Sequence, residues 1–189
     1  MDRTLLITKA GKLKKLAACV DSVGNHKYGA HARYYENGQL RDSMVCVNGK
    51  VDGQFVHYYE NGQMQAIGYY TNHPKKGHYY VSYHENGQVG QTKRLRNGQS
   101  SIREKIYYES SALQCKAMID KNGYKKTVHY YFESGQTSQI ERYKKGGHHC
   151  GKWKYYYENG QLKGVEYFKK GLYFRSIEHA SDGTKTILE

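Results

Sequence analysis

A four-residue motif, Glu-Asn-Gly-Gln, returns about every 24 residues along this sequence. Complete copies begin at Glu36, Glu60, Glu85 and Glu158, and degenerate copies begin at Glu109 and Glu133. A repeat of this length indicates that each unit buries its apolar face only against its neighbours. We therefore expect an elongated repeat array, an architecture that more often presents a binding surface than an active site.

Each unit has the pattern of a β-hairpin. Residues 55–59 are rich in aromatic and β-branched residues, which is typical of a strand. Asn61-Gly62 then favours a two-residue type I′ turn, and a second strand is expected from Gln63 to Thr71. A further turn is expected eleven residues after the first, at Asn48-Gly49, Asn97-Gly98, Asn122-Gly123, Lys145-Gly146 and Lys170-Gly171.

These hairpins predict an all-β fold, an elongated antiparallel meander of about seven hairpins in a single twisted layer. We expect one repeat domain over residues 1–189. Within it, residues 1–27 form a degenerate N-terminal cap repeat, residues 28–175 form six repeats, and residues 176–189 form a C-terminal cap.

The turn assigns side chains to the two faces of the sheet. With a two-residue turn, Tyr59 pairs with Met64, and cross-strand partners share a face. The dry face then collects three sets of residues from the repeats: Phe55, Tyr80, Val128 and Trp153; Tyr35, Tyr59, Tyr108, Phe132 and Tyr157; and Leu40, Met64, Val89, Leu113 and Leu162. A one-residue bulge at the turn would exchange the faces.

The opposite face carries one tyrosine four residues before each turn position, with apolar and basic neighbours. We predict that a partner binds there, on Tyr34, Tyr58, Tyr83, Tyr107, Tyr131, Tyr156, Arg94 and Arg142. Tyrosine suits a half-hydrated surface because its ring packs while its hydroxyl stays in water. The alternative interpretation is that these tyrosines only stabilise the sheet through cross-strand packing.

The surface is strongly basic, with 30 lysines and arginines against 17 aspartates and glutamates and a net charge of +13. This charge favours an acidic protein, an anionic membrane surface or nucleic acid as the partner, and it also helps to keep a tyrosine-rich sheet soluble. Nucleic acid is disfavoured because no nucleic-acid-binding motif is present and the basic residues are spread through every unit. Membrane docking is an alternative that lacks a second anchoring signal.

No residue pattern predicts catalysis, a metal site or a cofactor. His148-His149-Cys150 cannot close a tetrahedral metal site alone, so an expanded polar loop is expected there. The turn glutamates are expected to be solvated, and no phosphate loop or nucleophile elbow occurs. Cys19 and Cys46 occupy a position that apolar residues fill in other units. We therefore expect free cysteines, a cytoplasmic setting and a protein that is not an enzyme.

The repeat resembles the bacterial variant of the MORN repeat. The matching residues are Gly53, Phe55, Tyr58, Tyr59, Glu60, Asn61, Gly62, Gln63 and Met64, and again Gly151, Trp153, Tyr156, Tyr157, Glu158, Asn159, Gly160, Gln161 and Leu162. The resemblance covers roughly residues 28–175. Ser110-Ser111-Ala112 and His73-Pro74 depart from the pattern, so we expect those units to be less regular.

The resemblance also implies a function. Bacterial proteins of this kind resemble the YwqK-like antitoxin family, some members of which neutralise a toxin or effector, whereas eukaryotic MORN arrays are linked with membranes, scaffolding and dimerisation. We therefore expect a non-enzymatic antitoxin or immunity-type protein that binds an acidic toxin or effector through the tyrosine-rich, basic face. The alternative is a basic scaffold on anionic lipid. A second copy could also pair with a terminal strand edge.

Overall fold

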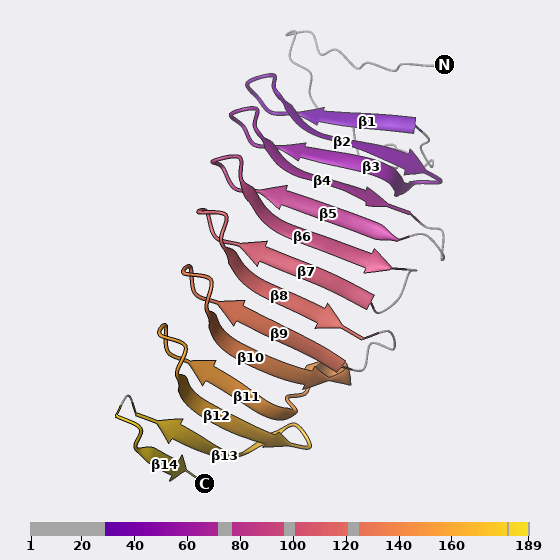
Figure 1. Ribbon diagram of the computed structural model, residues 1–189. Helices are drawn as coiled ribbons and strands as arrows, with labels where there is room; N and C mark the ends of the chain where they lie inside the picture. The colour runs from indigo at the N-terminus through magenta and orange to yellow at the C-terminus, as the bar shows by residue number, and fades with distance from the viewer. Residues whose placement is uncertain (1–28, 72–76, 97–100, 121–124, 181, 189) are drawn as a thin grey trace.

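The computed structural model describes residues 29–71, 77–96, 101–120, 125–180 and 182–188. Over these residues the backbone forms one open antiparallel sheet of 14 strands, in which every strand pairs with its neighbours in sequence (Figure 1). The strands are β1 (Gly29–Tyr34), β2 (Leu40–Val47), β3 (Lys50–Tyr58), β4 (Met64–Tyr70), β5 (His78–Tyr83), β6 (Val89–Arg96), β7 (Ser101–Tyr107), β8 (Leu113–Ile119), β9 (Lys125–Tyr131), β10 (Thr137–Lys144), β11 (Gly151–Tyr156), β12 (Leu162–Lys169), β13 (Leu172–His179) and β14 (Lys185–Leu188).

The predicted all-β meander in a single layer is confirmed. The only helical element in the described ranges is a 3-10 turn, η1 (Lys145–Gly147). The expected cap in residues 1–27 lies outside the described residues, as do His73-Pro74 and the turns expected at Asn97-Gly98 and Asn122-Gly123.

The motif turn has three residues, so the predicted type I′ geometry is wrong. In the hairpin of β3 and β4, the Tyr59 amide donates to the Gln63 carbonyl at 2.8 Å, and the Gly62 amide donates to the Tyr59 carbonyl at 2.9 Å. Gly62 has φ +85°, whereas Asn61 is not in the left-handed region. Asn61 Oδ1 instead accepts a 2.9 Å hydrogen bond from the Gln63 amide, which is the local interaction that asparagine supplies in turns.

The longer turn is followed by a bulge that restores the predicted register. Tyr58 pairs with Met64, the register shifts by one residue, and His57 then pairs with Ala66. From that point the pairing is the one that a two-residue turn would give, so the two faces are not exchanged. The correction concerns the residue two positions after the turn glycine. Such residues share a face with the tyrosine ladder and not with the dry face: Leu40, Met64, Val89, Leu113 and Leu162.

Turns between repeats follow the prediction in two described cases. Asn48 and Gly49 have φ +51° and +74°, and Lys170 and Gly171 have φ +54° and +88°, which are the two positive values of a type I′ turn. Each turn joins strands whose flanking residues pair directly. Between β10 and β11 the turn is expanded, and it includes η1.

The degenerate middle unit is as regular as the others, contrary to expectation. Ser111 takes the place of the turn glycine and adopts φ +70°. The same two backbone hydrogen bonds close the turn, from Tyr108 to Ala112 and from Ser111 to Tyr108. The repeat geometry is therefore strong enough to hold a serine in a conformation that costs about 1–2 kcal/mol for a residue with a side chain.

A second set of tyrosines, three residues before each turn glycine, fastens each repeat to the next. The hydroxyl of Tyr59 donates to the carbonyl of Tyr83, one repeat later, at 2.8 Å. Equivalent bonds run from Tyr35 to Tyr58 at 2.6 Å, from Tyr108 to Tyr131 at 2.9 Å and from Tyr157 to His179 at 3.0 Å. In the repeat that has histidine at this position, His84 Nε2 lies 3.0 Å from the Tyr107 carbonyl oxygen.

The buried side chains concentrate on the face opposite the tyrosine ladder. Phe55, Ala117, Val128 and Trp153 are at most 7% exposed and pack there, and Cys115 joins Ala117 and Val128 in the central cluster. Phe55 lies directly over Gly68, where a Cβ atom would approach the phenylalanine ring to 2.4 Å. The prediction that the residue seven positions before the motif-turn position lies on the dry face is therefore correct for Phe55, Val128 and Trp153.

Candidate functional site

The predicted partner-binding tyrosines share one face and form a ladder across the sheet. The tyrosine face, as we call it, carries Tyr34, Tyr58, Tyr83, Tyr107, Tyr131 and Tyr156, each at the end of its strand beside the motif turn. Each pairs across its hairpin with a small or aliphatic residue, as Tyr107 does with Leu113 and Tyr156 with Leu162. The motif turns all lie at the same end of the strands (Figure 1), so the ladder crosses the sheet from strand to strand at that end.

Ladder tyrosines differ from the tyrosines that fasten the repeats. All six are partly exposed. None of their hydroxyls has a hydrogen-bond partner among the described residues, whereas the hydroxyls of Tyr35, Tyr59, Tyr108 and Tyr157 are each bound to a backbone carbonyl. The ladder therefore presents rings with free polar tips, which is the form in which tyrosine serves best at interfaces.

Basic residues occupy the middle of the tyrosine face. Residues that pair from strand to strand form one continuous row across the tyrosine face. This row is apolar near the N-terminal strands, at Val56, Ile67 and Val81, and near the C-terminal strands, at Val165 and Ile177. Its central members are Thr92, Lys105, Lys116, His129, Ile140 and Lys154. Arg94 and Arg142, both predicted, lie on the same face and are exposed.

The sequence reasoning missed several cations of this face. Arg103, Lys105, Lys152, Lys154 and Arg175 all lie on it. A usable signal was present, because alternate residues of a strand share a face. Lys105 and Lys154 stand two residues before a ladder tyrosine, and Arg103 and Lys152 stand four before, so counting back by twos from the ladder would have identified them.

Within the strands from β4 to β13, none of the described acidic residues lies on the tyrosine face. The acidic residues of these strands, Glu104, Glu141, Glu166 and Glu178, pair with residues of the other face, which we call the carboxylate face. Cations occur on both faces of these strands, since Lys93 and Lys126 also lie on the carboxylate face, but the strand carboxylates are confined to that one face. This confinement leaves the tyrosine face of the described strands with an excess of positive charge.

Positive charges on the tyrosine face stand directly opposite one another. Arg94 pairs with Arg103, and Lys105 pairs with Lys116, whose other neighbour is His129. Like charges at directly opposed positions destabilise a sheet. Burial, followed by the positive charges of Lys116 and Arg142, lowers the pKa of His129 below its usual value. The field of this surface thus opposes any further positive charge.

Carboxylates on the opposite face are held by tyrosine hydroxyls. Glu141 is 7% exposed, and its Oε2 accepts hydrogen bonds from Tyr130 at 3.2 Å and Tyr143 at 2.5 Å. Tyr155 donates to Glu166 at 2.7 Å. Burial and then the interaction with Glu141 raise the pKa of Tyr130 to about 12, and the pKa of Tyr143 is raised by burial and by its hydrogen bond to Glu141. These acids are structural.

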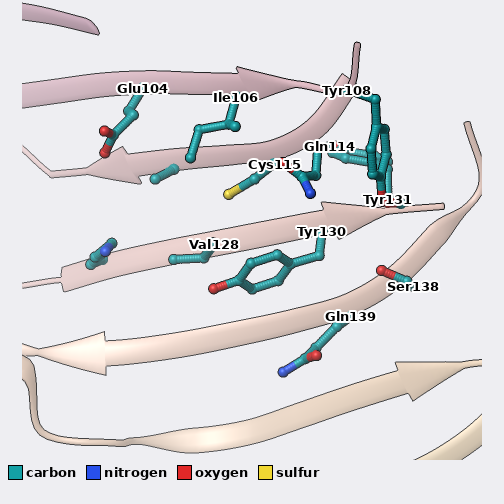
Figure 2. Close-up of a pocket in the computed structure, with 12 residues that line it drawn as sticks. Glu104, Ile106, Tyr108, Gln114, Cys115, Val128, Tyr130, Tyr131, Ser138 and Gln139 are labelled. Atoms are coloured by element: carbon teal, nitrogen blue, oxygen red, sulfur yellow. The ribbon is translucent and has the colours of Figure 1, made fainter. Parts of the chain in front are cut away.

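A hollow of about 460 Å³ on the carboxylate face is lined by Glu104, Cys115, Lys126, Tyr130 and Gln139, among others (Figure 2). Its Glu104 accepts a 2.6 Å hydrogen bond from Gln91 Nε2. Burial, reinforced by the negative charge of Glu104, raises the pKa of the Cys115 thiol. A protonated thiol is a poor nucleophile, so Cys115 is not activated for nucleophilic attack.

The remaining predicted features give a mixed outcome. Within the described ranges, no group of three or more His, Cys, Asp or Glu side chains is placed to hold a metal ion. His149 packs its ring 4.2 Å from Trp153 and 4.9 Å from Phe168, so the expanded loop is anchored by an aromatic cluster and is less polar than expected. Cys115 and Cys150 are free.

Cys46 departs from the expectation of free cysteines. It is fully buried, as its position in the repeat predicts, but it is disulfide-bonded. The partner lies outside the described residues. The part of the chain that the structure describes contains no helix long and apolar enough to cross a membrane.

Comparison with known proteins gives one family match. The MORN repeat variant family matches residues 51–72 and 150–170, which contain most of β3, all of β4, and the hairpin of β11 and β12. No curated protein matches the sequence. The crystal structure of TcdB2-TccC3-TEV is similar over 94% of this chain, at 13% identity and a TM-score of 0.23. This chain spans 13% of the length of that protein, and similarity this low carries no information on function.

The two family matches and the hairpin sheet support a MORN-repeat protein. Such proteins are generally non-enzymatic repeat modules. The fold and the family thus fit a repeat binding module.

Proposed function

We propose that this protein binds an acidic protein partner through the tyrosine face and has no enzymatic activity. The observation that carries the proposal is the confinement of the strand carboxylates to one face, which leaves the cations of the other face without a carboxylate on the same strands. Between β4 and β13 the described strands place cations and free-hydroxyl tyrosines on one face, while the carboxylates lie on the other.

The arrangement of this face fits a protein interface. Ladder tyrosines and their aliphatic partners form an amphipathic strip where the strands meet the motif turns. The cations lie on the same strands, farther from those turns. Aromatic side chains are frequent anchors of binding energy, and surrounding charges mainly steer the encounter and set specificity. A partner whose carboxylates meet Arg94, Arg103, Lys105 and Lys116 would relieve the repulsion between these opposed pairs.

More specifically, we propose an antitoxin or immunity-type role of the kind that the resemblance to YwqK-like bacterial proteins implies. The mechanism would be steric occlusion: an open sheet of this length covers a broad area of a toxin or effector and blocks the surface that the toxin uses. Opposite charge accelerates association, which suits a neutralising partner. The disulfide of Cys46 argues against the cytoplasmic setting expected from the sequence, because disulfides are rare where thiols are kept reduced, so a cytoplasmic location is not part of this proposal.

The test is the double variant Tyr83→Ala with Tyr107→Ala, two adjacent members of the ladder. Tyr70→Ala with Tyr173→Ala is the matched control, because both tyrosines lie on the carboxylate face and are 48% and 50% exposed. We expect the ladder variant to weaken partner binding by roughly 2–4 kcal/mol in sum without unfolding. The control should bind like the wild type.

Two other results would each contradict the proposal. If the ladder variant unfolds while the control does not, the tyrosines belong to the folding core and the packing interpretation stands. If the only ligands are anionic vesicles or nucleic acid, and their affinity falls steeply with added salt, the charge serves non-specific binding instead.

A further inference from the structure

A second hollow lies at the end of the strands opposite the motif turns. It is formed by the turn between β10 and β11 and the turn between β12 and β13. It has a volume of about 830 Å³, and its lining includes Lys144, Lys145, His148, Lys169 and Lys170. None of the residues that line it is a carboxylate. The hollow lies apart from the tyrosine ladder, which is at the other end of the strands. The partner binding proposed above does not require the hollow.

Repetition of the sequence brings these lysines together. Lys144-Lys145-Gly146 and Lys169-Lys170-Gly171 are the same tripeptide one repeat apart. They end β10 and β12, which are separated in the sheet by β11 alone. Two strand spacings place the two lysine pairs about 10 Å apart. Flexible lysine side chains on both sides can therefore reach one ligand between them.

The expanded loop between β10 and β11 joins the two turns into one concave site. His148 of the loop reaches the neighbouring turn: a Cβ atom placed on Gly171 would lie 3.5 Å from His148 Nδ1. His149 is fixed behind it, 4.9 Å from Phe168 and 4.2 Å from Trp153, measured between ring centroids. The hollow thus has an aromatic floor held by packing and a cationic rim.

We propose that this hollow binds a ligand with two or more clustered phosphate groups. Several cations around one cavity, with no carboxylate in its lining, concentrate a field that attracts polyvalent anions. A ligand with linked phosphates carries several times the charge of one phosphate and has enough oxygens to contact all four lysines at once, so it should bind more tightly than a single phosphate. The clustered phosphates belong either to a soluble polyphosphate compound or to a phosphorylated lipid headgroup.

The chain contains a reporter for this site. Trp153 is its single tryptophan, and the ring of His149, which lines the hollow, packs against it at a tilt. Titration of the full chain with inorganic tripolyphosphate should give a saturable change in tryptophan fluorescence. Orthophosphate should bind at least about tenfold more weakly, because it carries less charge and has too few oxygens to contact all four lysines at once.

Lys144→Ala with Lys169→Ala removes one lysine from each side of the hollow. Lys50→Ala with Lys185→Ala is the control, because it changes the net charge equally at two exposed lysines outside the hollow. We expect the first pair to raise the tripolyphosphate Kd at least about tenfold and the control to change it by less than about twofold. Lys144→Arg with Lys169→Arg, which keeps both charges, should retain binding and covers the case in which the alanine pair folds poorly.

Vesicles distinguish the two sources of phosphate. Lipids with clustered headgroup phosphates are compared with lipids of equal total charge that carry single phosphodiesters. Preference for the first, lost in the Lys144→Ala, Lys169→Ala variant, supports the site with a lipid ligand, and binding of tripolyphosphate alone supports it with a soluble one. Equal weakening in both alanine pairs, or equal affinity for orthophosphate and tripolyphosphate, would show diffuse attraction to a basic protein and overturn the proposal.

Discussion

Replacing Glu141 with glutamine tests whether the carboxylate face is structural. The Glu141 carboxylate accepts hydrogen bonds from the hydroxyls of Tyr130 and Tyr143 and a 2.5 Å bond from Gln139 Nε2, while only 7% of the residue is exposed. Hydrogen bonds to a charged acceptor stabilise by about 1.5–3 kcal/mol, against about 0.5–1.5 kcal/mol for a neutral acceptor. Two weakened hydroxyl bonds therefore predict a loss of about 2 kcal/mol.

The assay is urea unfolding of the wild type and the variant, followed by tyrosine and tryptophan fluorescence. For a chain of this length, a loss of about 2 kcal/mol corresponds to a decrease in Tm of about 4–8 °C. Glu166→Gln, which disturbs the single bond from Tyr155, should cost roughly half as much. Glu133→Gln, in an exposed motif turn, should change stability by less than about 0.5 kcal/mol.

Equal stability of the Glu141 and Glu133 variants would refute the reasoning. It would mean that the hydroxyl groups do not hold the buried carboxylate, and that the acidic residues of this face are as free to interact as those of the turns. The assignment of the carboxylate face as structural, and of the tyrosine face as the binding surface, would then lose its physical basis.

Two further predictions concern the turns and the pH dependence. Gly160 has φ +85°, so Gly160→Val should destabilise the fold by about 1–2 kcal/mol, and Ser111→Gly, at φ +70°, should stabilise it by a similar amount; unchanged urea midpoints would contradict the turn geometry. His129 has a lowered pKa in the folded state, so the neutral form is favoured there, and its contribution is complete above about pH 6.5 and lost as the pH falls below that value. Stability should therefore decrease between about pH 7.5 and 5.5 by less in His129→Gln than in the wild type, and equal decreases would show that His129 is not responsible.

The architecture could be predicted from the sequence because the same motif occurs in several in-phase copies. Each Glu-Asn-Gly-Gln copy marks a turn, and the alternation between turns places successive strands without ambiguity. The ladder residues from Tyr34 to Tyr156 were correctly placed on one face. The turn type was not, because Asn-Gly is compatible both with a type I′ turn and with a three-residue loop that has glycine at its positive φ. The difference moved Leu40 and its equivalents to the other face.

The finer properties of the site depend on contacts between repeats, which one repeat unit does not encode. Tyr58 and Tyr59 are adjacent and chemically identical, yet the hydroxyl of Tyr59 binds a carbonyl of the next repeat while that of Tyr58 has no partner among the described residues. Only the stacking of hairpins separates these roles. The opposition of Lys105 and Lys116 likewise requires the register between two strands. The net charge alone gave no indication that the strand carboxylates are confined to one face.

The most direct test of the central claim is affinity capture from host lysate with three forms of the full chain as bait. These are the wild type, the ladder variant with Tyr83→Ala and Tyr107→Ala, and the control with Tyr70→Ala and Tyr173→Ala. After nuclease treatment and a high-salt wash, the account predicts one stoichiometric protein on the wild type and the control, and its loss from the ladder variant. Retention of that protein on the ladder variant, or capture of nothing that survives high salt, would contradict the account.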